Sequence, residues 1–282
     1  MANVKKAFVT GWPVDHSRSP LIHNYWLKKN KILGEYLKRP CPPEDLQQFL
    51  TNLEHEGFVG GNITVPHKEA AFDLVDKTYD AAQTLEAVNT VWLGKNGLQG
   101  TNTDGYGFLA NLDDRHPGWD SEINRNKAAL VLGAGGASRA VIYALMGRGF
   151  SEVVIANRTL ARADALVEHF GPPCRAIEIA HAVPGELSPA IIINTTSIGM
   201  NDQKSPLDLK GFASTTIVHD IVYSPLITPL LAQAGEFGMP IVDGLGMLLH
   251  QAVPGFEKWF GIRPEVDEPL RKILLDDLGE AP

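Results

Sequence analysis

The sequence predicts an α/β protein with two domains around a cleft, the second built on a doubly wound parallel sheet. The strongest observation is the run LVLGAGGASR at 130–139, where an apolar strand enters a glycine turn that opens a helix at about Ser138. A second is the series of strand-like runs that follows, most of them separated by helices. A third is that strands and helices also alternate in the long stretch before it. Together these observations indicate a Rossmann-type second domain.

The stretch before the glycine turn is expected to form an α/β layer of its own. Proline suits the first turn of a helix that starts at Ser19, and apolar residues at helical spacing predict a helix over 43–56. Two strands that flank a turn at 94–97 predict a hairpin. The expected strands are 6–10, 35–38, 58–65, 89–93 and 98–100, and the other expected helices run from Pro66 to about 76 and from about 104 to 114.

The part that begins at the glycine turn is expected to hold the parallel sheet and a helical C-terminus. The polar run 115–126 is interpreted as the connection into it. Pro254 and Gly255 are expected to break the helical pattern near the end of the chain. These last helices exceed what the sheet needs, so they are expected to return to the first domain. The expected strands are 129–133, 152–157, 174–179, 190–195, 215–220 and 240–243, and the expected C-terminal helices are 245–251, 256–259 and 268–278.

Composition is typical of a soluble globular protein. Of the 282 residues, 44% are hydrophobic, which supports a sizeable core. The net charge of −8 argues against nucleic acid as a partner, since no basic face is evident. No apolar run is long enough to cross a membrane and no signal-peptide pattern is present, so no membrane partner is expected. Cys41 and Cys174 lie far apart and suggest no disulfide framework, which favours a reducing compartment and a cytoplasmic location.

The glycine turn is the first candidate for ligand binding. Glycines let the main chain approach a pyrophosphate closely, and the helix start offers free N–H groups. An NAD site would carry an acid about 20 residues on, but here the next strand ends in Asn157 and Arg158, with Arg162 one turn later. Two arginines suit the 2′-phosphate of NADP; the alternative is a tight turn and two solvated charges. The cofactor-site candidates are Gly133, Ala134, Gly135, Gly136, Ala137, Asn157, Arg158, Thr159 as helix N-cap, and Arg162.

Polar residues near the start of the chain are candidates for a substrate site. Ser17 and Ser19 lie where a strand leads into a helix, which suits a carboxylate, although capping by Ser19 alone also explains them. Thr64 and Lys68 follow a strand that looks buried, from which a lysine can reach into a cleft; a surface position is the alternative for Lys68.

Amides and acids follow further strand ends. Asn89 and Asp104 are candidates, with turn formation as the alternative. In open α/β sheets, ligands bind at the C-terminal ends of the strands. No helical His pair with Glu and no cysteine cluster is present, so no metal is expected, and no Gly-x-Ser-x-Gly run supports an esterase nucleophile. The polar strand ends in the second domain are 194–197, 220–223 and 243–244, with Gln251 on the helix beyond.

The chain resembles the shikimate dehydrogenase family, within the shikimate/quinate dehydrogenase group, over nearly its whole length. Two positions depart from the family pattern: Glu86 stands where glycine is frequent, and Ile221 where methionine is common. The matching runs occur in family order. They are HSRSP at 16–20, GNITVPHKE at 61–69, AVNTV at 87–91, NTDGYGF at 102–108, GAGGASRA at 133–140, NRT at 157–159, NTTSIGM at 194–200 and DGLGMLLHQA at 243–252.

The resemblance implies NADP-dependent interconversion of shikimate and 3-dehydroshikimate in aromatic amino-acid biosynthesis. It implies a substrate-binding catalytic domain at 1–104 plus 245–282 and an NADP-binding domain at 105–244. Lys68 would be the catalytic acid/base, paired with Asp104. The resemblance also assigns Ser17 and Ser19 to the substrate carboxylate, Thr64, Asn89, Asp104, Tyr223 and Gln251 to ring hydroxyls or carboxylate, and Asp80, Ile221 and Gly244 to the surroundings of the cofactor.

The chemistry fits these roles but leaves alternatives open. A lysine can take the hydroxyl proton of a secondary alcohol if desolvation lowers its pKa, whereas a neighbouring Asp104 favours the ammonium and a role as positioned cation. One rival function is a quinate/shikimate dehydrogenase. Another is a non-catalytic NADP-responsive regulator on the same fold, which would have no reason to keep both Lys68 and Asp104. The sequence does not decide the oligomeric state, and a homodimer remains an open expectation.

Overall fold

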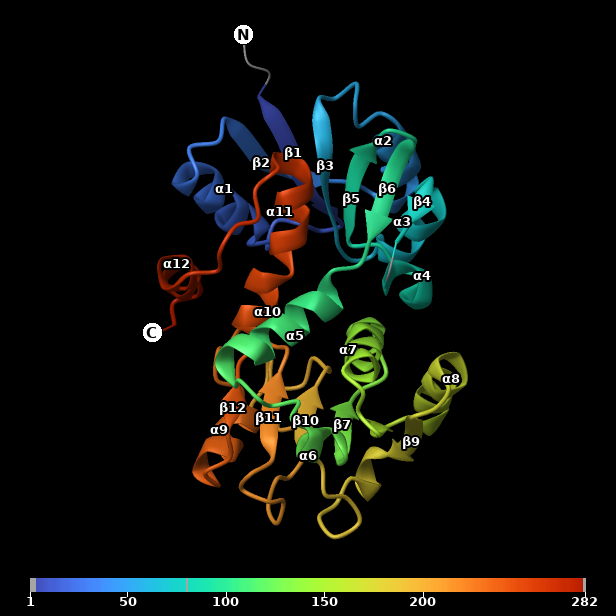
Figure 1. Cartoon of the computed structure of the whole chain (residues 1–282), viewed down its shortest axis with the longest axis vertical. Coiled ribbons are helices and arrows are strands. Elements are labelled where there is room, and N and C mark those ends of the chain that lie inside the picture. The colour runs from blue at the N-terminus through green and yellow to red at the C-terminus, as the bar shows by residue number, and fades with distance from the viewer. Residues whose placement is uncertain (1–3, 80, 281–282) are drawn as a thin grey trace. The chain divides into compact units, whose positions relative to one another are not determined.

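The computed structural model describes residues 4–79 and 81–280, so the predicted cofactor residue Asp80 lies outside the described residues. The chain divides into two compact units, whose elements are labelled in Figure 1. The first unit holds the described residues up to Asp104 together with those from Leu249 on, and the second holds Gly105–Leu248. Residues 245–248, expected in the first domain, therefore belong to the second unit.

The described part of the first unit contains a six-stranded mixed sheet in the order β2-β1-β3-β5-β6-β4. Strand β1 is parallel to its neighbours β2 and β3, whereas β5 is antiparallel to β3 and β6. Gly97 has φ +100, which permits the tight β5–β6 turn that the sequence predicts. The strands are β1 (Lys5–Gly11), β2 (Gly34–Pro40), β3 (Phe58–Ile63), β4 (Lys77–Thr78), β5 (Thr90–Gly94) and β6 (Gly97–Thr101).

Helices from both ends of the chain cover this sheet. The C-terminal helix α11 packs on it directly: the indole N–H of Trp259 donates to the Val91 carbonyl oxygen at 2.8 Å, and a side chain at Gly60 would collide with the same ring. A core cluster that includes Phe8, Phe49 and Phe58 fills the interior of this unit. The helices are α1 (Ser19–Lys29), η1 (Pro43–Asp45), α2 (Leu46–Thr51), α3 (Lys68–Leu74), α4 (Ala81–Leu85), α11 (Ala252–Phe260) and α12 (Glu268–Leu278).

The second unit contains a six-stranded sheet in the order β12-β11-β10-β7-β8-β9, in which the paired strands are parallel. From β7 the chain moves first to β8 and β9 on one side and then returns to β10 on the other, so the strand order reverses beside β7. This is the doubly wound arrangement that the sequence predicts. The strands are β7 (Ala128–Leu132), β8 (Glu152–Asn157), β9 (Cys174–Glu178), β10 (Ile191–Asn194), β11 (Ile217–Asp220) and β12 (Ile241–Val242).

The apolar strand β7 is buried on both faces, as its sequence AALVL suggests. Ala129 and Val131 belong to the core cluster on one face, which also contains side chains of α5 and α7. Leu130 and Leu132 belong to the cluster on the opposite face, which contains side chains of α9. The helices of this unit are α5 (Asp104–Arg115, whose first residue belongs to the first unit), α6 (Glu122–Arg125), α7 (Gly136–Gly147), α8 (Leu160–Phe170), η2 (Ile179–His181), α9 (Pro229–Glu236) and α10 (Leu245–His250, which ends in the first unit).

The predicted fold class is confirmed, but several local expectations are wrong. Pro254 and Gly255 do not interrupt the C-terminal helix: Pro254 is in the first turn of α11, where its missing N–H would have no helical partner in any case. The helix expected over 43–56 is a short 3₁₀ turn followed by α2. The connection at 115–126 contains the short helix α6, and the two-residue strand β4 was not expected. Helix α7 begins at Gly136, two residues before the expected Ser138.

Candidate active site

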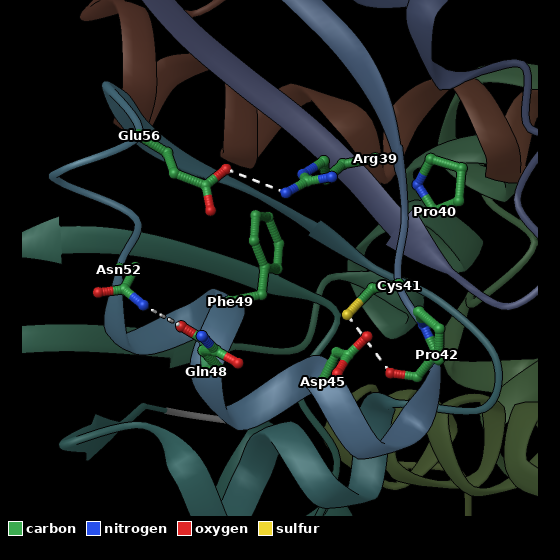
Figure 2. A pocket seen from close by; sticks show the side chains of 9 residues that line it. All are labelled: Arg39, Pro40, Cys41, Pro42, Asp45, Gln48, Phe49, Asn52 and Glu56. Atoms are coloured by element: carbon green, nitrogen blue, oxygen red, sulfur yellow. Dashed lines mark hydrogen bonds and ion pairs between the residues drawn. The ribbon is translucent and has the colours of Figure 1, made fainter.

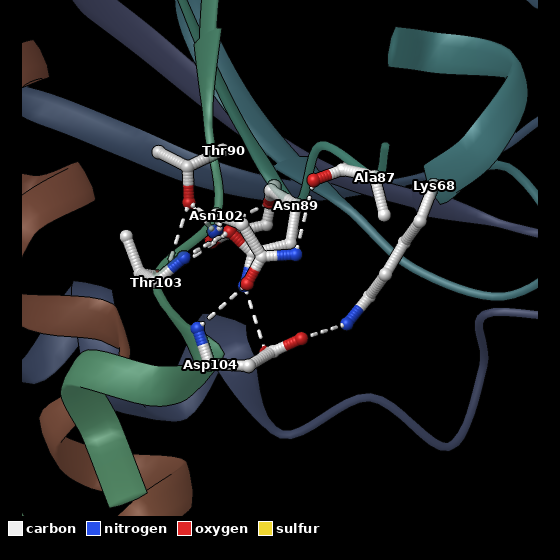
Figure 3. Close-up of polar contacts among 8 residues, drawn as sticks. Lys68, Ala87, Asn89, Thr90, Asn102, Thr103 and Asp104 are labelled. Carbon is white, nitrogen blue, oxygen red and sulfur yellow. Dashed lines mark hydrogen bonds and ion pairs between the residues drawn. The ribbon is translucent and has the colours of Figure 1, made fainter. Parts of the chain in front are cut away.

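Lys68 and Asp104 form an ion pair in the first unit (Figure 3). Lys68 is the first residue of α3 and Asp104 is the first residue of α5, so both side chains lie at helix N-termini. The ammonium nitrogen of Lys68 donates to Asp104 Oδ2 at 2.5 Å, and the two side chains are 28% and 19% exposed. The pair is therefore partly shielded from water while the lysine remains within reach of a small ligand.

Asn89 holds the second oxygen of Asp104. Its amide N–H donates to Asp104 Oδ1 at 2.8 Å, while its own oxygen accepts from the Thr103 backbone N–H at 2.9 Å (Figure 3). The backbone N–H of Asp104 in turn donates to Asn102 Oδ1 at 3.0 Å. Three of the predicted site residues, Lys68, Asn89 and Asp104, thus belong to one hydrogen-bonded network.

The other predicted substrate residues of the first unit lie at turns beside this sheet. Ser19 is the first residue of α1 and is buried, and its backbone N–H donates to Ser17 Oγ at 3.4 Å. The alternative that Ser19 caps the helix is therefore wrong, because Arg18 occupies the cap position. Thr64 follows β3 and its backbone N–H donates to the Thr10 carbonyl at 2.8 Å. Gln251 occupies the position before α11 and is partly buried.

Glu86 shows what the departure from the family pattern means for the backbone. It has φ +50, in the left-handed region that favours glycine. The next residue, Ala87, accepts from the Asn102 side chain through its carbonyl at 3.1 Å, and Asn89 follows two residues later. The tight turn that carries Asn89 is therefore built with glutamate in a conformation usually left to glycine.

The glycine turn after β7 has open space where a dinucleotide would lie. Gly133 has φ +108, and a side chain there would collide with Thr195 and Thr196 at the end of β10. A side chain at Gly135 or Gly136 would meet no atom within 4 Å. The first N–H groups of a helix have no acceptor within it, and in the described chain no side chain caps α7. The turn therefore fits a pyrophosphate, which would occupy this space and accept from those N–H groups.

Ser138 explains why the imperfect glycine pattern still works. The third glycine of the dinucleotide pattern lets helix and strand pack closely. Ser138 is fully buried, and its hydroxyl donates to the Gly135 carbonyl at 2.5 Å. A small side chain that satisfies its own hydroxyl locally can therefore replace that glycine.

The two arginines after β8 are exposed and, within residues 4–79 and 81–280, neither guanidinium has an ion-pair partner. Arg158 precedes α8 and Arg162 lies in its first turn. Thr159 is at the N-cap position as predicted, but its side chain makes no capping bond; instead, Asn157 Nδ2 donates to its carbonyl at 2.9 Å. Two free cations beside a helix start fit the 2′-phosphate of NADP.

The remaining predicted residues of the second unit surround the ends of β11 and β12. A side chain at Gly244 would collide with the carbonyl oxygens of Ile221 and Val222, so this contact requires glycine. Tyr223 is partly buried and follows Val222. The structure thus brings Gly244 and Ile221 together.

Asp220 has a structural role that no motif in the sequence indicates. This fully buried carboxylate accepts from Asn194 Nδ2 at 3.0 Å, from the Thr228 hydroxyl at 2.7 Å and from the Val222 backbone N–H at 3.0 Å. Burial raises the pKa of Asp220, and the side-chain bonds from Asn194 and Thr228 oppose that shift. The carboxylate ties β10 to the loop that carries Ile221 and Tyr223.

A separate pocket of about 270 Å³ lies beside α2 in the first unit (Figure 2). Its charged residues include Arg39 and Glu56, which pair at 3.3 Å. The carbonyl of Cys41, another lining residue, is 2.8 Å from His67 Nε2, and His67 directly precedes Lys68. One wall of this pocket therefore supports the turn that leads to Lys68.

The described residues contain neither a metal-binding cluster nor a membrane-spanning helix. No group of three or more His, Cys, Asp or Glu side chains there could hold a metal ion. Within the same residues, no helix combines the length and the apolar character that a membrane span requires.

Comparisons with known proteins agree with the motifs. Family models match residues 9–91 (shikimate dehydrogenase substrate binding domain), 120–197 (shikimate / quinate 5-dehydrogenase) and 244–268 (shikimate 5′-dehydrogenase C-terminal domain). The chain is 52% identical over 276 residues to the shikimate dehydrogenase (NADP(+)) of Rhizobium etli, which covers 97% of this chain and 95% of the relative.

Solved structures show the same fold. Shikimate 5-dehydrogenase from Thermus thermophilus, in complex with NADP(H) and shikimate, is 36% identical with a TM-score of 0.83, covering 98% of this chain and 99% of that one. Quinate dehydrogenase from Corynebacterium glutamicum, in complex with NAD, is 28% identical with a TM-score of 0.87, covering 97% of this chain and 99% of that one. The matched family models and a relative that is 52% identical over nearly the whole chain show that the chain belongs to the shikimate dehydrogenase family.

Proposed function

We propose that the protein catalyses the reversible, NADP-dependent oxidation of shikimate to 3-dehydroshikimate, a step in aromatic amino-acid biosynthesis. The observation that carries the proposal is the Lys68–Asp104 pair, held by Asn89 in a partly shielded site. The open glycine turn and the unpaired Arg158 support NADP as the cofactor.

The proposed substrate contacts follow the family motifs. Ser17 and Ser19 bind the carboxylate, where hydroxyl groups near a helix start suit an anion. A ring with several hydroxyl groups needs directional partners, and hydroxyl, amide and carboxylate side chains provide them. The residues proposed for the ring are Thr64, Lys68, Asn89, Asp104, Tyr223 and Gln251.

The proposed cofactor contacts lie mainly in the second unit. The N–H groups at the start of α7 hold the pyrophosphate, and Arg158 with Arg162 holds the 2′-phosphate. The full set proposed is Asp80, Gly133, Ala134, Gly135, Gly136, Ala137, Asn157, Arg158, Thr159, Arg162, Ile221 and Gly244. In this proposal the first unit is the substrate-binding catalytic domain, and the second unit, which includes residues 245–248, is the NADP-binding domain.

In the proposed reaction Lys68 transfers the proton of the reacting hydroxyl group. A bound NADP⁺ would supply the acceptor for the hydride that leaves the ring carbon bearing the reacting hydroxyl. Oxidation also requires that hydroxyl to lose its proton, and Lys68 takes it when its side chain is the neutral amine; in the reverse direction the ammonium form of Lys68 returns the proton to the carbonyl oxygen. Asp104 fixes the position of the Lys68 nitrogen through the 2.5 Å contact, and Asn89 fixes Asp104.

A quinate/shikimate dehydrogenase is the second candidate, favoured by the similarity to a quinate dehydrogenase solved with NAD. Arg158 argues for NADP and the biosynthetic reaction, because NAD has no 2′-phosphate for it to bind. The deciding experiment measures reduced cofactor formed from shikimate and from quinate, each with NADP and with NAD. The proposal requires the shikimate and NADP combination to have the highest kcat/KM, whereas a preference for quinate with NAD would overturn it.

The cellular setting is part of the same proposal. The free thiols of Cys41 and Cys174 and a biosynthetic reaction favour the cytoplasm. The homodimer remains a prediction, and light scattering of the purified protein tests it.

A further inference from the structure

A series of hydrogen bonds leads from Tyr36 on β2 to the carboxylate of Asp104. The Tyr36 hydroxyl lies 2.5 Å from Asn62 Oδ1, and Asn62 Nδ2 lies 3.1 Å from Thr90 Oγ1. Thr90 Oγ1 lies 2.9 Å from Asn89 Oδ1, and Asn89 Nδ2 lies 2.8 Å from Asp104 Oδ1. The series crosses from β2 to β3 and β5 and ends at the ion pair with Lys68.

Backbone groups fix which way the two amides point. Asn62 Nδ2 also lies 3.2 Å from the carbonyl oxygen of Asn89, which can only accept, so the atom facing it must be the NH₂ group. Asn89 Oδ1 lies 2.9 Å from the backbone N–H of Thr103, which can only donate, so the atom facing it must be the oxygen. Neither amide can rotate by 180° without losing a buried backbone partner.

These orientations determine the direction of every donor. Because Asn62 offers its oxygen to Tyr36, the Tyr36 hydroxyl must donate. Asn89 Oδ1 can only accept, so Thr90, which accepts from Asn62, gives its single proton to Asn89 at 2.9 Å rather than to the Thr103 hydroxyl at 3.4 Å. Asn89 then donates to Asp104. The whole series donates toward the carboxylate, and bonds aligned in one direction strengthen one another.

Tyr36 is the first donor of the series. Burial raises the pKa of Tyr36 well above its usual range, and a hydrogen bond from the Ser19 side chain opposes that shift, so Tyr36 remains a protonated donor. The series therefore starts at a protonated Tyr36 and ends at the proposed proton-transfer pair.

The residues of the series are buried, so each hydrogen bond between them is costly to lose. Tyr36, Asn62, Thr90 and Asn89 are each at most 5% exposed, so water cannot replace a lost partner. The His23 ring stacks on Tyr36 with centroids 4.0 Å apart, and burial lowers the pKa of His23 to about 3. His23 is therefore neutral at working pH and places no charge beside the series.

We propose that Tyr36 and Thr90 are positioning residues, which act through Asn62 and Asn89 to hold Asp104, and with it Lys68, in the orientation for proton transfer. This inference rests on the proposed function for its kinetic consequences. It also has a structural consequence that holds for any substrate: the Asn89 amide is locked in the free protein.

The test compares variants that remove only a hydroxyl group. Y36F keeps the ring and its stacking on His23, and T90V keeps the shape of threonine. Y36F removes the donor to the buried Asn62 Oδ1, and T90V removes one of the partners of Asn62 Nδ2 and of Asn89 Oδ1. We therefore expect kcat for shikimate oxidation to fall about tenfold in each variant, while the KM for shikimate changes less than about twofold. The conservative variant T90S keeps the hydroxyl and should restore most of kcat.

A matched control and a double variant separate positioning from general damage. Tyr25 also donates a hydrogen bond in the first unit, to Asp267 at 2.8 Å, and Y25F should leave kcat unchanged. Tyr36 and Thr90 act through one series of bonds. The kcat of Y36F/T90V should therefore be no lower than the kcat of the less active single variant. Losses that multiply in the double variant, or a Y36F kcat equal to wild type, would overturn the proposal.

A readout without substrate keeps the two proposals apart. The side-chain amide protons of Asn89, followed by NMR in the free protein, should exchange with solvent at least about tenfold faster in Y36F and T90V than in wild type and Y25F. Unchanged exchange overturns the positioning role whatever the substrate is. Faster exchange in variants of a protein whose wild type does not oxidise shikimate would support the locked amide and overturn the proposed function alone.

Discussion

In the first unit the candidate site residues are already bonded to one another, whereas in the second unit the groups proposed to meet the cofactor have space or solvent before them. Lys68, Asp104 and Asn89 form a closed network of hydrogen bonds. Side chains built at Gly135 and Gly136 would meet no atom within 4 Å, and Arg158 has no ion-pair partner in the described part of the chain.

This difference fits the two tasks. Proton transfer requires groups held to a fraction of an ångström before the substrate arrives, and bonds among side chains provide that order. A dinucleotide is large and charged, so backbone N–H groups and exposed guanidinium groups can bind it without first being held by bonds to other side chains. Breaking the network in the first unit should therefore lower kcat, whereas removing a cofactor contact should act on one cofactor and spare the other.

The largest effect is expected from Lys68. K68A removes the proposed acid/base and should lower kcat by roughly 10²–10⁴, with a much smaller change in the KM for shikimate. Steady-state kinetics at neutral pH tests this. K272A is the control, since Lys272 pairs with Asp276 on the exposed face of α12. A K68A variant that keeps more than half of the wild-type kcat would rule out the assignment.

The next effect concerns the carboxylate. Replacing Ser17 and Ser19 together by alanine should weaken shikimate binding by about 1–3 kcal/mol, seen as a higher KM for shikimate. The KM for NADP should barely change. S121A, at the start of α6, is the matched control because Ser121 makes no side-chain capping bond. If the two KM values rose together, the serines would be structural and the substrate role would be lost.

Arg158 should affect one cofactor only. R158A should cut kcat/KM with NADP about 10- to 150-fold, the worth of hydrogen bonds to a charged group, and leave the reaction with NAD nearly unchanged. High salt should weaken NADP binding more in the wild type than in the variant. R175A is the control, because Arg175 pairs with Glu152 at 2.8 Å in the same unit. Equal losses with both cofactors would show that Arg158 does not bind the phosphate.

How far the sequence predicts the molecule depends on the range of the interactions involved. The second sheet follows from local signals: the AALVL strand, the Gly133 turn and the apolar strands after it are each readable within about ten residues. The helix break at Pro254 was wrong because a proline in the first turn costs no hydrogen bond, and its position in the turn depends on where the helix starts.

The site residues were predictable only where they lie inside a family motif whose residues have assigned roles. Lys68 and Asp104 were predicted from the family motifs, although 36 positions separate them. Asn62 and Thr90 were visible inside the same motifs, but their bonds link different strands and no spacing rule reports them. The role of Tyr36 could not be predicted at all, because it depends on strand β2 lying beside β1 and on burial by α1.

The last prediction concerns two buried histidines, one in each unit. Burial lowers the pKa of His219 from 6.5 to about 4, against a smaller opposing effect of Asp243, and lowers that of His23 from 6.5 to about 3. A histidine that must be neutral when folded binds its proton only when unfolded. Between pH 6.5 and these folded values the unfolded state therefore holds more protons, and the free energy of unfolding falls as the pH falls.

H219Q tests this in the second unit alone. His219 Nε2 lies 3.2 Å from Asn111 Nδ2, and glutamine keeps an acceptor that can reach this amide. One pKa unit is worth about 1.4 kcal/mol, so His219 alone costs about 2 kcal/mol between pH 7 and pH 5. Urea unfolding at the two pH values should show a loss smaller by about that amount in H219Q. H55Q, at an exposed position, should lose as much as the wild type. If H219Q lost as much as the wild type, acid sensitivity would come from other groups, and the burial of His219 would carry no proton linkage.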